Sequence, residues 1–203
     1  VSLDGEFLTI KREALDAIVA GGAVASGAVF VRAEVVGIDA FPDGSVPDVP
    51  ETEASFEGNA LLKARAVCAA TGVPAVADDS GLCVDALNGM PGILSARWSG
   101  GLVAGRSTDV GNLELVLAQL GDTPDDRLGA QVRCAVALVL PDGREATVDG
   151  EMRGLLVREP RGSNGFGYDP IFVPDGETRT SAELSNEEKD AISHRGNALR
   201  ALV

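Results

Sequence analysis

Three observations on the sequence predict a mixed α/β fold in a single domain. Stretches with the apolar pattern of strands alternate with stretches that have helical periodicity, and no linker-like segment separates them. The chain of 203 residues is long enough to bury a full core. Hydrophobic residues make up 45% of the chain and aromatic residues only 4%, so we expect a core of Val, Leu, Ala and Ile. Two lobes around a cleft would also fit this pattern.

The first fifty residues carry strand and helix patterns followed by a loop. Leu15, Ile18 and Val19 form an apolar stripe at helical spacing, and Gly21 with Gly22 ends that helix. The expected elements are a strand at Glu6–Ile10, a helix at Lys11–Ala20, a strand within 29–38 and a loop at Phe41–Pro50.

The next helix is predicted over Asn59–Ala70. Its Ala, Leu, Lys and Arg residues favour a helix, and Gly72 followed by Pro74 ends it. We expect Leu62, Ala66 and either Ala69 or Ala70 to face the core. Lys63 then lies on a different face, where a lysine is ordinarily solvated.

Two adjacent carboxylates follow this helix, in the stretch Ala77–Gly81. The residues Pro74–Ala77 are short and apolar, which is typical of the end of a buried strand. Asp78 and Asp79 should point to opposite sides, because side chains alternate along a strand. One of them could help hold Mg²⁺, which accepts one or two carboxylates and otherwise keeps water and phosphate oxygens. An ordinary acidic turn is the alternative, because Asp, Ser and Gly are common turn residues.

The second half of the chain again alternates strand and helix patterns. Ser185 or Asn186 is expected to cap a helix that has Glu187 and Glu188 in its first turn. A helix is expected at Asn112–Leu120, with Leu113, Val116, Leu117 and Leu120 in register on one face. The other expected elements are a strand at Gln131–Leu140 with a hairpin partner at Glu145–Gly150, strands at Leu155–Arg158 and Ile171–Val173, and a helix at Asn197–Val203.

The composition of the chain argues against several classes of function. A net charge of −14 argues against nonspecific nucleic-acid binding. No apolar run has the length of a membrane span, and the first residues lack a cationic signal-peptide region, so we expect a cytoplasmic protein. Cys68, Cys83 and Cys134 lack metal-ligand spacing and are expected to be buried, reduced thiols.

Four groups of charged, polar and aromatic side chains could all serve one binding site. Each has an ordinary alternative: a lysine on a helix is usually solvated, a histidine can be a satisfied imidazole, and a phenylalanine can simply pack. Together they can bind a nucleotide and a metal, since an aromatic ring stacks on a base, carboxylates hold Mg²⁺ and cations meet phosphates or base carbonyls. The groups are Glu51 with Lys63, Asp78 with Asp79 and Ser80, the loop Phe166–Asp169, and Lys189 with His194 and Arg195.

Five blocks of sequence, in order and spacing, resemble the inosine/xanthosine triphosphate pyrophosphatase family. Its members hydrolyse deaminated purine nucleoside triphosphates to the monophosphate and pyrophosphate. The resemblance covers about residues 46 to 203. The blocks are Glu51–Ala64, Ala77–Leu82, Pro91–Gly92 with Ser95–Arg97, Gly165–Pro170, and Glu188–Lys189 with Ser193–Gly196.

The resemblance implies an elongated central sheet flanked by helices, two lobes around a nucleotide-binding cleft, and a homodimer. It implies that Asp79 is the catalytic carboxylate and a Mg²⁺ ligand, and that Glu51 is a second ligand. By matching position, Lys63 would contact the triphosphate and Ser80 the nucleotide. Four loop residues would surround the base: Phe166, Gly167, Tyr168 and Asp169. Three cationic or imidazole side chains would recognise the 6-keto group: Lys189, His194 and Arg195.

The resemblance also implies a reason for base selection. A 6-keto oxygen accepts hydrogen bonds, so cationic donors favour it. The 6-amino group of adenine is itself a donor and would leave those donors unpaired, at a cost of about a few kcal/mol.

Residues 1–45 depart from the family pattern. Family members open with a Ser/Thr-x-Asn-x-x-Lys loop that wraps the triphosphate, whereas Phe7–Glu13 runs directly from strand to helix without that asparagine. Lys11 or Arg12 could serve as a phosphate cation instead, and the tract Gly100–Gly111 is also unlike the family's short acidic link. The alternative function is therefore a nucleotide-binding protein with reduced or lost turnover. A pyrophosphatase for other modified nucleotides is a third.

Overall fold

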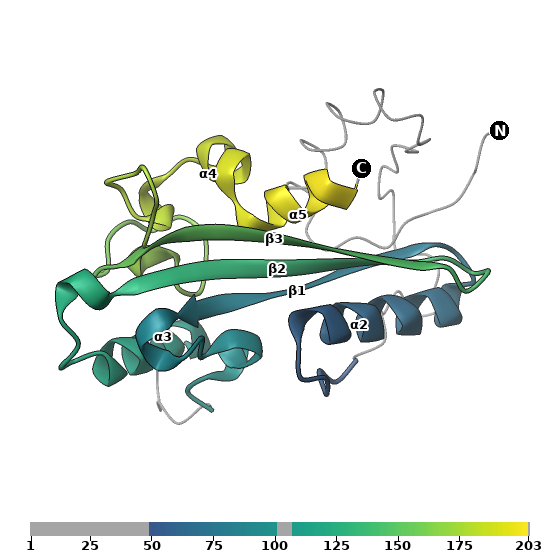
Figure 1. Cartoon of the computed structure of the whole chain (residues 1–203), viewed down its shortest axis with the longest axis horizontal. Coiled ribbons are helices and arrows are strands. Elements are labelled where there is room, and N and C mark those ends of the chain that lie inside the picture. Colours follow the sequence, from purple (N-terminus) through teal and green to yellow (C-terminus); the bar gives the residue numbers. More distant parts are fainter. Residues whose placement is uncertain (1–48, 101–106, 203) are drawn as a thin grey trace. The chain divides into compact units, whose positions relative to one another are not determined.

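The computed structural model describes residues 49–100 and 107–202, and its elements are those of a mixed α/β fold (Figure 1). The strand, helix and second strand expected before residue 40 lie outside the described residues. The sheet has the strand order β1-β2-β3-β4. The elements are α2 (Phe56–Thr71), β1 (Ala75–Val84), α3 (Thr108–Gln119), β2 (Gly129–Val139), β3 (Glu145–Leu156), β4 (Phe172–Pro174), α4 (Asn186–Ile192) and α5 (His194–Leu202).

The chain divides into two compact units, and β1, β2 and β3 contribute residues to both. The described part of the first unit comprises 49–79, 134–150 and 195–202, and that of the second comprises 80–100, 107–133 and 151–194. Neither unit contains a described helix long and apolar enough to cross a membrane.

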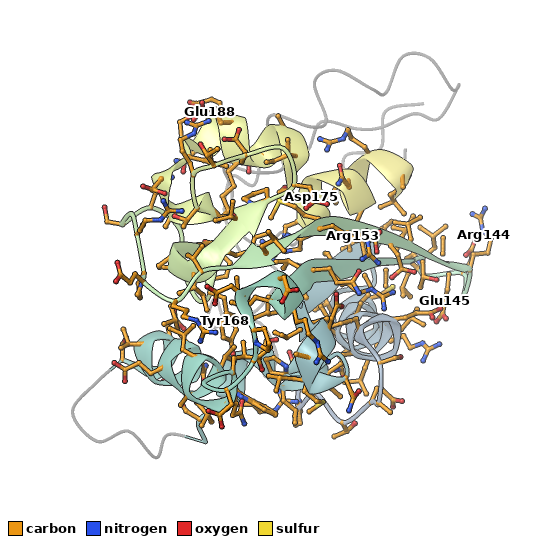
Figure 2. All side chains as sticks on the ribbon, turned by 60° about the vertical axis from the view of Figure 1, so that its left-hand side comes forward. Arg144, Glu145, Arg153, Tyr168, Asp175 and Glu188 are labelled. Atoms are coloured by element: carbon orange, nitrogen blue, oxygen red, sulfur yellow. The ribbon has the colours of Figure 1, made fainter. Side chains whose placement is uncertain are left out.

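In the first unit, α2 and α5 lie on opposite faces of the strands (Figure 1). Helix α5 packs on the sheet through Ala198 and Leu199, which meet Cys134 and Val136 of β2. At its tip, the β2–β3 hairpin carries Arg144 and Glu145 (Figure 2).

Helix α2 ends at Gly72 as predicted, but it begins at Phe56, three residues earlier than predicted, and its buried face differs from the predicted one. The Ser55 hydroxyl caps its N-terminus by accepting from the Gly58 N–H, and Gly72 ends it in a left-handed conformation. Ala60, Ala64 and Cys68 are buried, a stripe at i, i+4, i+8, whereas Leu62 and Ala66 are half-buried and Ala69 and Ala70 are exposed. The predicted stripe is wrong because polar contacts of α2 with β1, described below, set which face meets the sheet.

Strand β1 does not end before the acidic pair, as the sequence suggested, but runs through it to Val84. Neither the strand end nor the acidic turn is present. Side chains alternate between buried and half-buried along the first part of the strand, with Asp79 buried and Asp78 half-buried. The predicted alternation of the two carboxylates is therefore confirmed, and both lie within regular strand.

In the second unit, α3 lies on one face of the strands, and α4 lies on the other (Figure 1). The predicted apolar face of α3 is confirmed, since Leu113 and Val116 are buried together with Leu120 just beyond the helix. They share a core with Leu82, Leu156 and other residues of the strands.

The two strands predicted at Glu145–Gly150 and Leu155–Arg158 are one strand, β3. Gly154 lies inside this strand, where β3 pairs antiparallel with β4, opposite Pro174. A Cβ at Gly154 would collide with the Val173 carbonyl oxygen. The glycine is there because β4 approaches closely, not because the strand ends.

The C-terminal helices follow their capping signals. Ser185 caps α4, its hydroxyl accepting from the Glu188 N–H while the Glu188 carboxylate accepts from the Ser185 N–H, which completes a capping box. Helix α5 begins at His194, three residues earlier than predicted. Cys68, Cys83 and Cys134 are free and buried, as predicted.

Candidate active site

Four side chains of the first unit form one hydrogen-bonded group, which we call the carboxylate–lysine cluster. The Lys63 ammonium lies 3.0 Å from Asp79 Oδ1 and 3.2 Å from Glu51 Oε1. The Asn59 amide donates from Nδ2 to Asp79 Oδ2 over 3.0 Å. Both oxygens of Asp79 are therefore held, each by a different donor on α2.

The local structure explains how these groups meet. Asn59 and Lys63 are four residues apart on α2, so they project from the same side of the helix. Asp79 lies on the face of β1 that its neighbour Asp78 does not share. Glu51 comes from the extended segment before α2. The structure thus brings together three of the predicted site residues: Glu51, Lys63 and Asp79.

Burial and charge oppose each other in this cluster. Burial raises the pKa of the Asp79 carboxyl, and the hydrogen bond from Asn59 and the charge of Lys63 offset part of that rise. For Lys63, burial lowers the pKa, but the charge and hydrogen bonds of Asp79 and Glu51 outweigh it, so its pKa is raised overall. The lysine is therefore a firmly held cation.

Asp78 is held on its own side by α5. Arg195 donates to Asp78 Oδ2 from Nε over 2.9 Å and from Nη2 over 2.8 Å. The Cys134 thiol lies 3.6 Å from the same oxygen, and burial raises the pKa of that thiol. Arg195 thus anchors α5 to β1 in this structure, and its predicted contact with a base stays a prediction.

In the second unit, an exposed aromatic ring lies beside an ion pair; we call Phe166, Asp169 and Lys189 the aromatic-loop cluster. The Lys189 ammonium is 2.5 Å from Asp169 Oδ2 and 5.4 Å from the centroid of the Phe166 ring. The same carboxylate oxygen accepts from the Phe166 N–H over 2.8 Å. The Phe166 side chain is 54% exposed, so this ring is a large apolar surface that the fold leaves in solvent.

A glycine makes this tight arrangement possible. Gly165 has a φ of +80°, and a Cβ there would collide with Asp169 Oδ2 and come within 2.8 Å of Lys189 Nζ. Only glycine offers both that backbone conformation and that close approach at low cost.

The other two loop residues are held by neighbours in the second unit. Asp109, in the first turn of α3, accepts from the Gly167 N–H over 3.0 Å. The Tyr168 hydroxyl donates to the Ser95 carbonyl over 2.9 Å, its ring is buried, and Figure 2 marks its position. Burial also raises the pKa of that hydroxyl. Tyr168 therefore anchors the loop, and its predicted contact with a substrate stays a prediction.

The remaining predicted residues, Ser80 and His194, are half-buried at the middle of β1 and the start of α5. Two residues that hold the clusters, Asn59 and Asp109, were missed by sequence reasoning. A signal for Asn59 was present: a polar residue one helical turn before Lys63 lies on the same face.

The carboxylate pair has the donor chemistry that Mg²⁺ prefers. Glu51 and Asp79 supply hard oxygens close enough together to share one ammonium, and Mg²⁺ is commonly bound by one or two carboxylates plus water and phosphate oxygens. Among the residues described, no group of three or more His, Cys, Asp or Glu side chains is arranged to hold a metal.

Comparison with known proteins gives consistent matches. The model of the Ham1 family matches residues 16–203, a range that begins well before residue 46. Proteins named dITP/XTP pyrophosphatase from Streptomyces avermitilis and Mycobacteroides abscessus are 60% and 57% identical to this chain, over 84% and 86% of it and 82% and 84% of their own lengths.

Solved structures agree with the sequence matches. The nucleoside-triphosphatase / dITP/XTP pyrophosphatase of Mycobacterium abscessus superposes with a TM-score of 0.73 at 51% identity, covering 97% of this chain and 96% of that one. A HAM1 protein from Coxiella burnetii superposes with a TM-score of 0.70 at 44% identity, covering 77% of this chain and 79% of the other.

Proposed function

This chain belongs to the Ham1 family, and from that membership we propose that it hydrolyses deaminated purine nucleoside triphosphates (dITP, ITP and XTP) to the monophosphate and pyrophosphate. The observation that carries the proposal is the carboxylate–lysine cluster, in a chain 60% identical to a protein named dITP/XTP pyrophosphatase. A buried carboxylate beside a lysine suits the hydrolysis of a phosphoanhydride, in which negative charge builds up on the leaving group.

We assign the phosphate chemistry to the carboxylate–lysine cluster. Glu51 and Asp79 would hold a divalent cation, for which we propose Mg²⁺; when bound, it polarises phosphate oxygens and lowers the pKa of bound water. Asp79 orients the attacking water and accepts its proton. The water oxygen bonds to the α-phosphorus, and the bond from the α-phosphorus to the bridging oxygen breaks. Lys63 faces the negative charge that develops on the departing pyrophosphate.

We assign base recognition to the aromatic-loop cluster. Phe166 presents an exposed ring on which a purine can stack. The Lys189 ammonium lies near that ring and can donate to a 6-keto oxygen, with Asp169 fixing its position. A base that offers a 6-amino donor instead leaves one N–H donor of Lys189 without an acceptor, which predicts a preference for ITP over ATP of about 100-fold or more. Ser80, Gly167, Tyr168, His194 and Arg195 remain proposed contacts of the nucleotide.

We also propose that the protein is cytoplasmic and that it works as a homodimer, as the family resemblance implies. Light scattering after gel filtration tests the oligomer, with a mass twice the 20.8 kDa of the chain as the expected result. A single-chain mass at assay concentration would overturn the homodimer and leave the activity untouched.

Pyrophosphate release tests the activity. The purified protein is assayed with ITP, dITP, XTP, ATP and GTP, each with Mg²⁺ and with excess chelator. We expect fast release from the first three substrates with Mg²⁺ and little from ATP; GTP, which also carries a 6-keto oxygen, tests whether the 2-position of the base is read as well. Binding of IMP without release of pyrophosphate from any substrate would instead support the nucleotide-binding alternative.

A further inference from the structure

Asn59 is a fully buried polar residue at the centre of the carboxylate–lysine cluster. Its side chain has 0% exposure and makes two hydrogen bonds in opposite senses. Nδ2 donates to Asp79 Oδ2 over 3.0 Å, and Oδ1 accepts from the Glu53 N–H over 3.0 Å. A buried amide is costly unless both ends are satisfied, and here both are.

The partners of Asn59 determine which way its amide points. A carboxylate can only accept and a backbone N–H can only donate, so the nitrogen must face Asp79 and the oxygen must face Glu53. Few other side chains meet both demands. An aspartate would place an oxygen against the Asp79 carboxylate, and a leucine of similar size would satisfy neither partner.

One of the two bonds reaches a candidate metal ligand, and the other reaches the segment that carries the second. The first holds the Asp79 carboxylate directly. The other holds the main chain of the segment before α2 at a point two residues after Glu51. Lys63 contacts the carboxylates of both Glu51 and Asp79, but through a flexible side chain that is 23% exposed. The buried amide is the more rigid of the two links between Glu51, Asp79 and α2.

We propose that Asn59 is a positioning residue, which sets the spacing and orientation of Glu51 and Asp79 so that the pair can hold a divalent cation. This inference rests on the proposed function, because it takes those two carboxylates as the cation's ligands. Partners that orient metal ligands commonly contribute 10- to 100-fold in metal affinity. We expect the loss of Asn59 to weaken divalent-cation binding by about that factor.

The test is a titration of the full chain with Mn²⁺ alone, followed by electron paramagnetic resonance, which needs no substrate or turnover. Asn59→Leu removes both hydrogen bonds and keeps the branching and the number of side-chain heavy atoms. The matched control is Asn112→Leu, because Asn112 is a helical asparagine of the second unit that is 2% exposed and accepts from the Ser99 N–H over 2.7 Å. Asp79→Asn reports how much binding belongs to the proposed site.

Both asparagine variants should lose thermal stability, but only Asn59→Leu should weaken Mn²⁺ binding, by about 10- to 100-fold. If Asn59→Leu is unfolded by circular dichroism, Asn59→Ser is used in the same titration, since its side chain is too short to span both bonds. Wild-type affinity in a folded Asn59 variant, or an equal loss in Asn112→Leu, overturns the positioning role alone. If the wild-type protein binds no more Mn²⁺ than Asp79→Asn, the metal assignment of the proposed function is wrong and the inference is overturned with it.

Discussion

Replacement of Lys63 by methionine tests the electrostatics of the carboxylate–lysine cluster. Met keeps most of the aliphatic length of the lysine and removes the ammonium that lies 3.0 Å from Asp79 and 3.2 Å from Glu51. The two carboxylates are then left facing each other without a counter-charge. We expect the folded protein to lose stability and turnover together.

The size of the stability loss follows from burial. An exposed ion pair contributes about 0–1 kcal/mol, whereas removing one partner of a buried pair costs about 3–5 kcal/mol. The side chains here are 8% exposed for Asp79, 23% for Lys63 and 26% for Glu51, which lies between these limits. We therefore expect a loss of about 2–3 kcal/mol at neutral pH, or about 4–12 °C in Tm for a chain of this size.

The loss should depend on pH. Burial already raises the pKa of Asp79 above its ordinary value of 3.8, and removing Lys63 takes away a charge that lowers it, so the pKa of Asp79 rises further in the variant. A folded state with a raised carboxyl pKa binds its proton more tightly than the unfolded state, so stability returns as the pH falls through that pKa. The difference between wild type and variant should thus shrink from pH 8 towards pH 5.5.

Urea unfolding across this pH range, with and without Mg²⁺, measures these effects. Mg²⁺ should stabilise Lys63→Met more than wild type, because the two carboxylates no longer have an ammonium to compete with the cation. Arg65→Met is the matched control on the same helix: it breaks an exposed pair with Glu145 and should cost little. A loss that is the same at every pH would show that packing of the lysine stem, and not its charge, was removed, and the reasoning above would be refuted.

Three further substitutions test the assigned roles. Asp79→Asn should abolish turnover and leave the circular dichroism spectrum unchanged, because it removes a negative ligand without changing shape; wild-type pyrophosphate release from the folded variant would refute its catalytic role. Phe166→Ala should weaken IMP binding by about 1–3 kcal/mol in a calorimetric titration, the usual value of a base–aromatic stack, and an unchanged affinity would mean that no base stacks there. Gly165→Ala should raise the KM for ITP and lower the Tm, because its Cβ collides with Asp169 and strains a left-handed backbone; an unaltered KM would show that this loop does not bind the base.

Local signals were sufficient to predict several elements. The apolar face of α3 and the Ser185 cap of α4 depend on residues within one or two turns of each other, so spacing alone reveals them. The alternation of Asp78 and Asp79 was likewise predictable, since it depends only on the geometry of a strand.

The sequence could not show that the acidic pair lies within a strand. Two adjacent carboxylates disfavour a strand unless distant residues satisfy them. Asp79 is satisfied by Asn59, 20 positions away, and Asp78 by Arg195, 117 positions away. The division of β3 into two predicted strands was also wrong, because the strand continues through Gly154, where β4 approaches closely. Contacts between distant parts of the chain overrode local propensity in both places.

The sequence predicted the charged residues of the candidate site but not the residue that holds them in position. Glu51, Lys63 and Asp79 stood out as functional residue types, and the structure joins them in one cluster. Asn59 did not stand out, because a lone asparagine in a helix is unremarkable until its burial and both of its partners are known.

The central claim is that this chain cleaves dITP between the α- and β-phosphates. Phosphorus-31 magnetic resonance of one reaction, with dITP, Mg²⁺ and the purified protein, identifies the products directly. The account predicts dIMP and pyrophosphate in equal amounts, and no reaction with the Asp79→Asn variant. Orthophosphate with dIDP, or intact dITP after prolonged incubation with the folded wild-type protein, would contradict it.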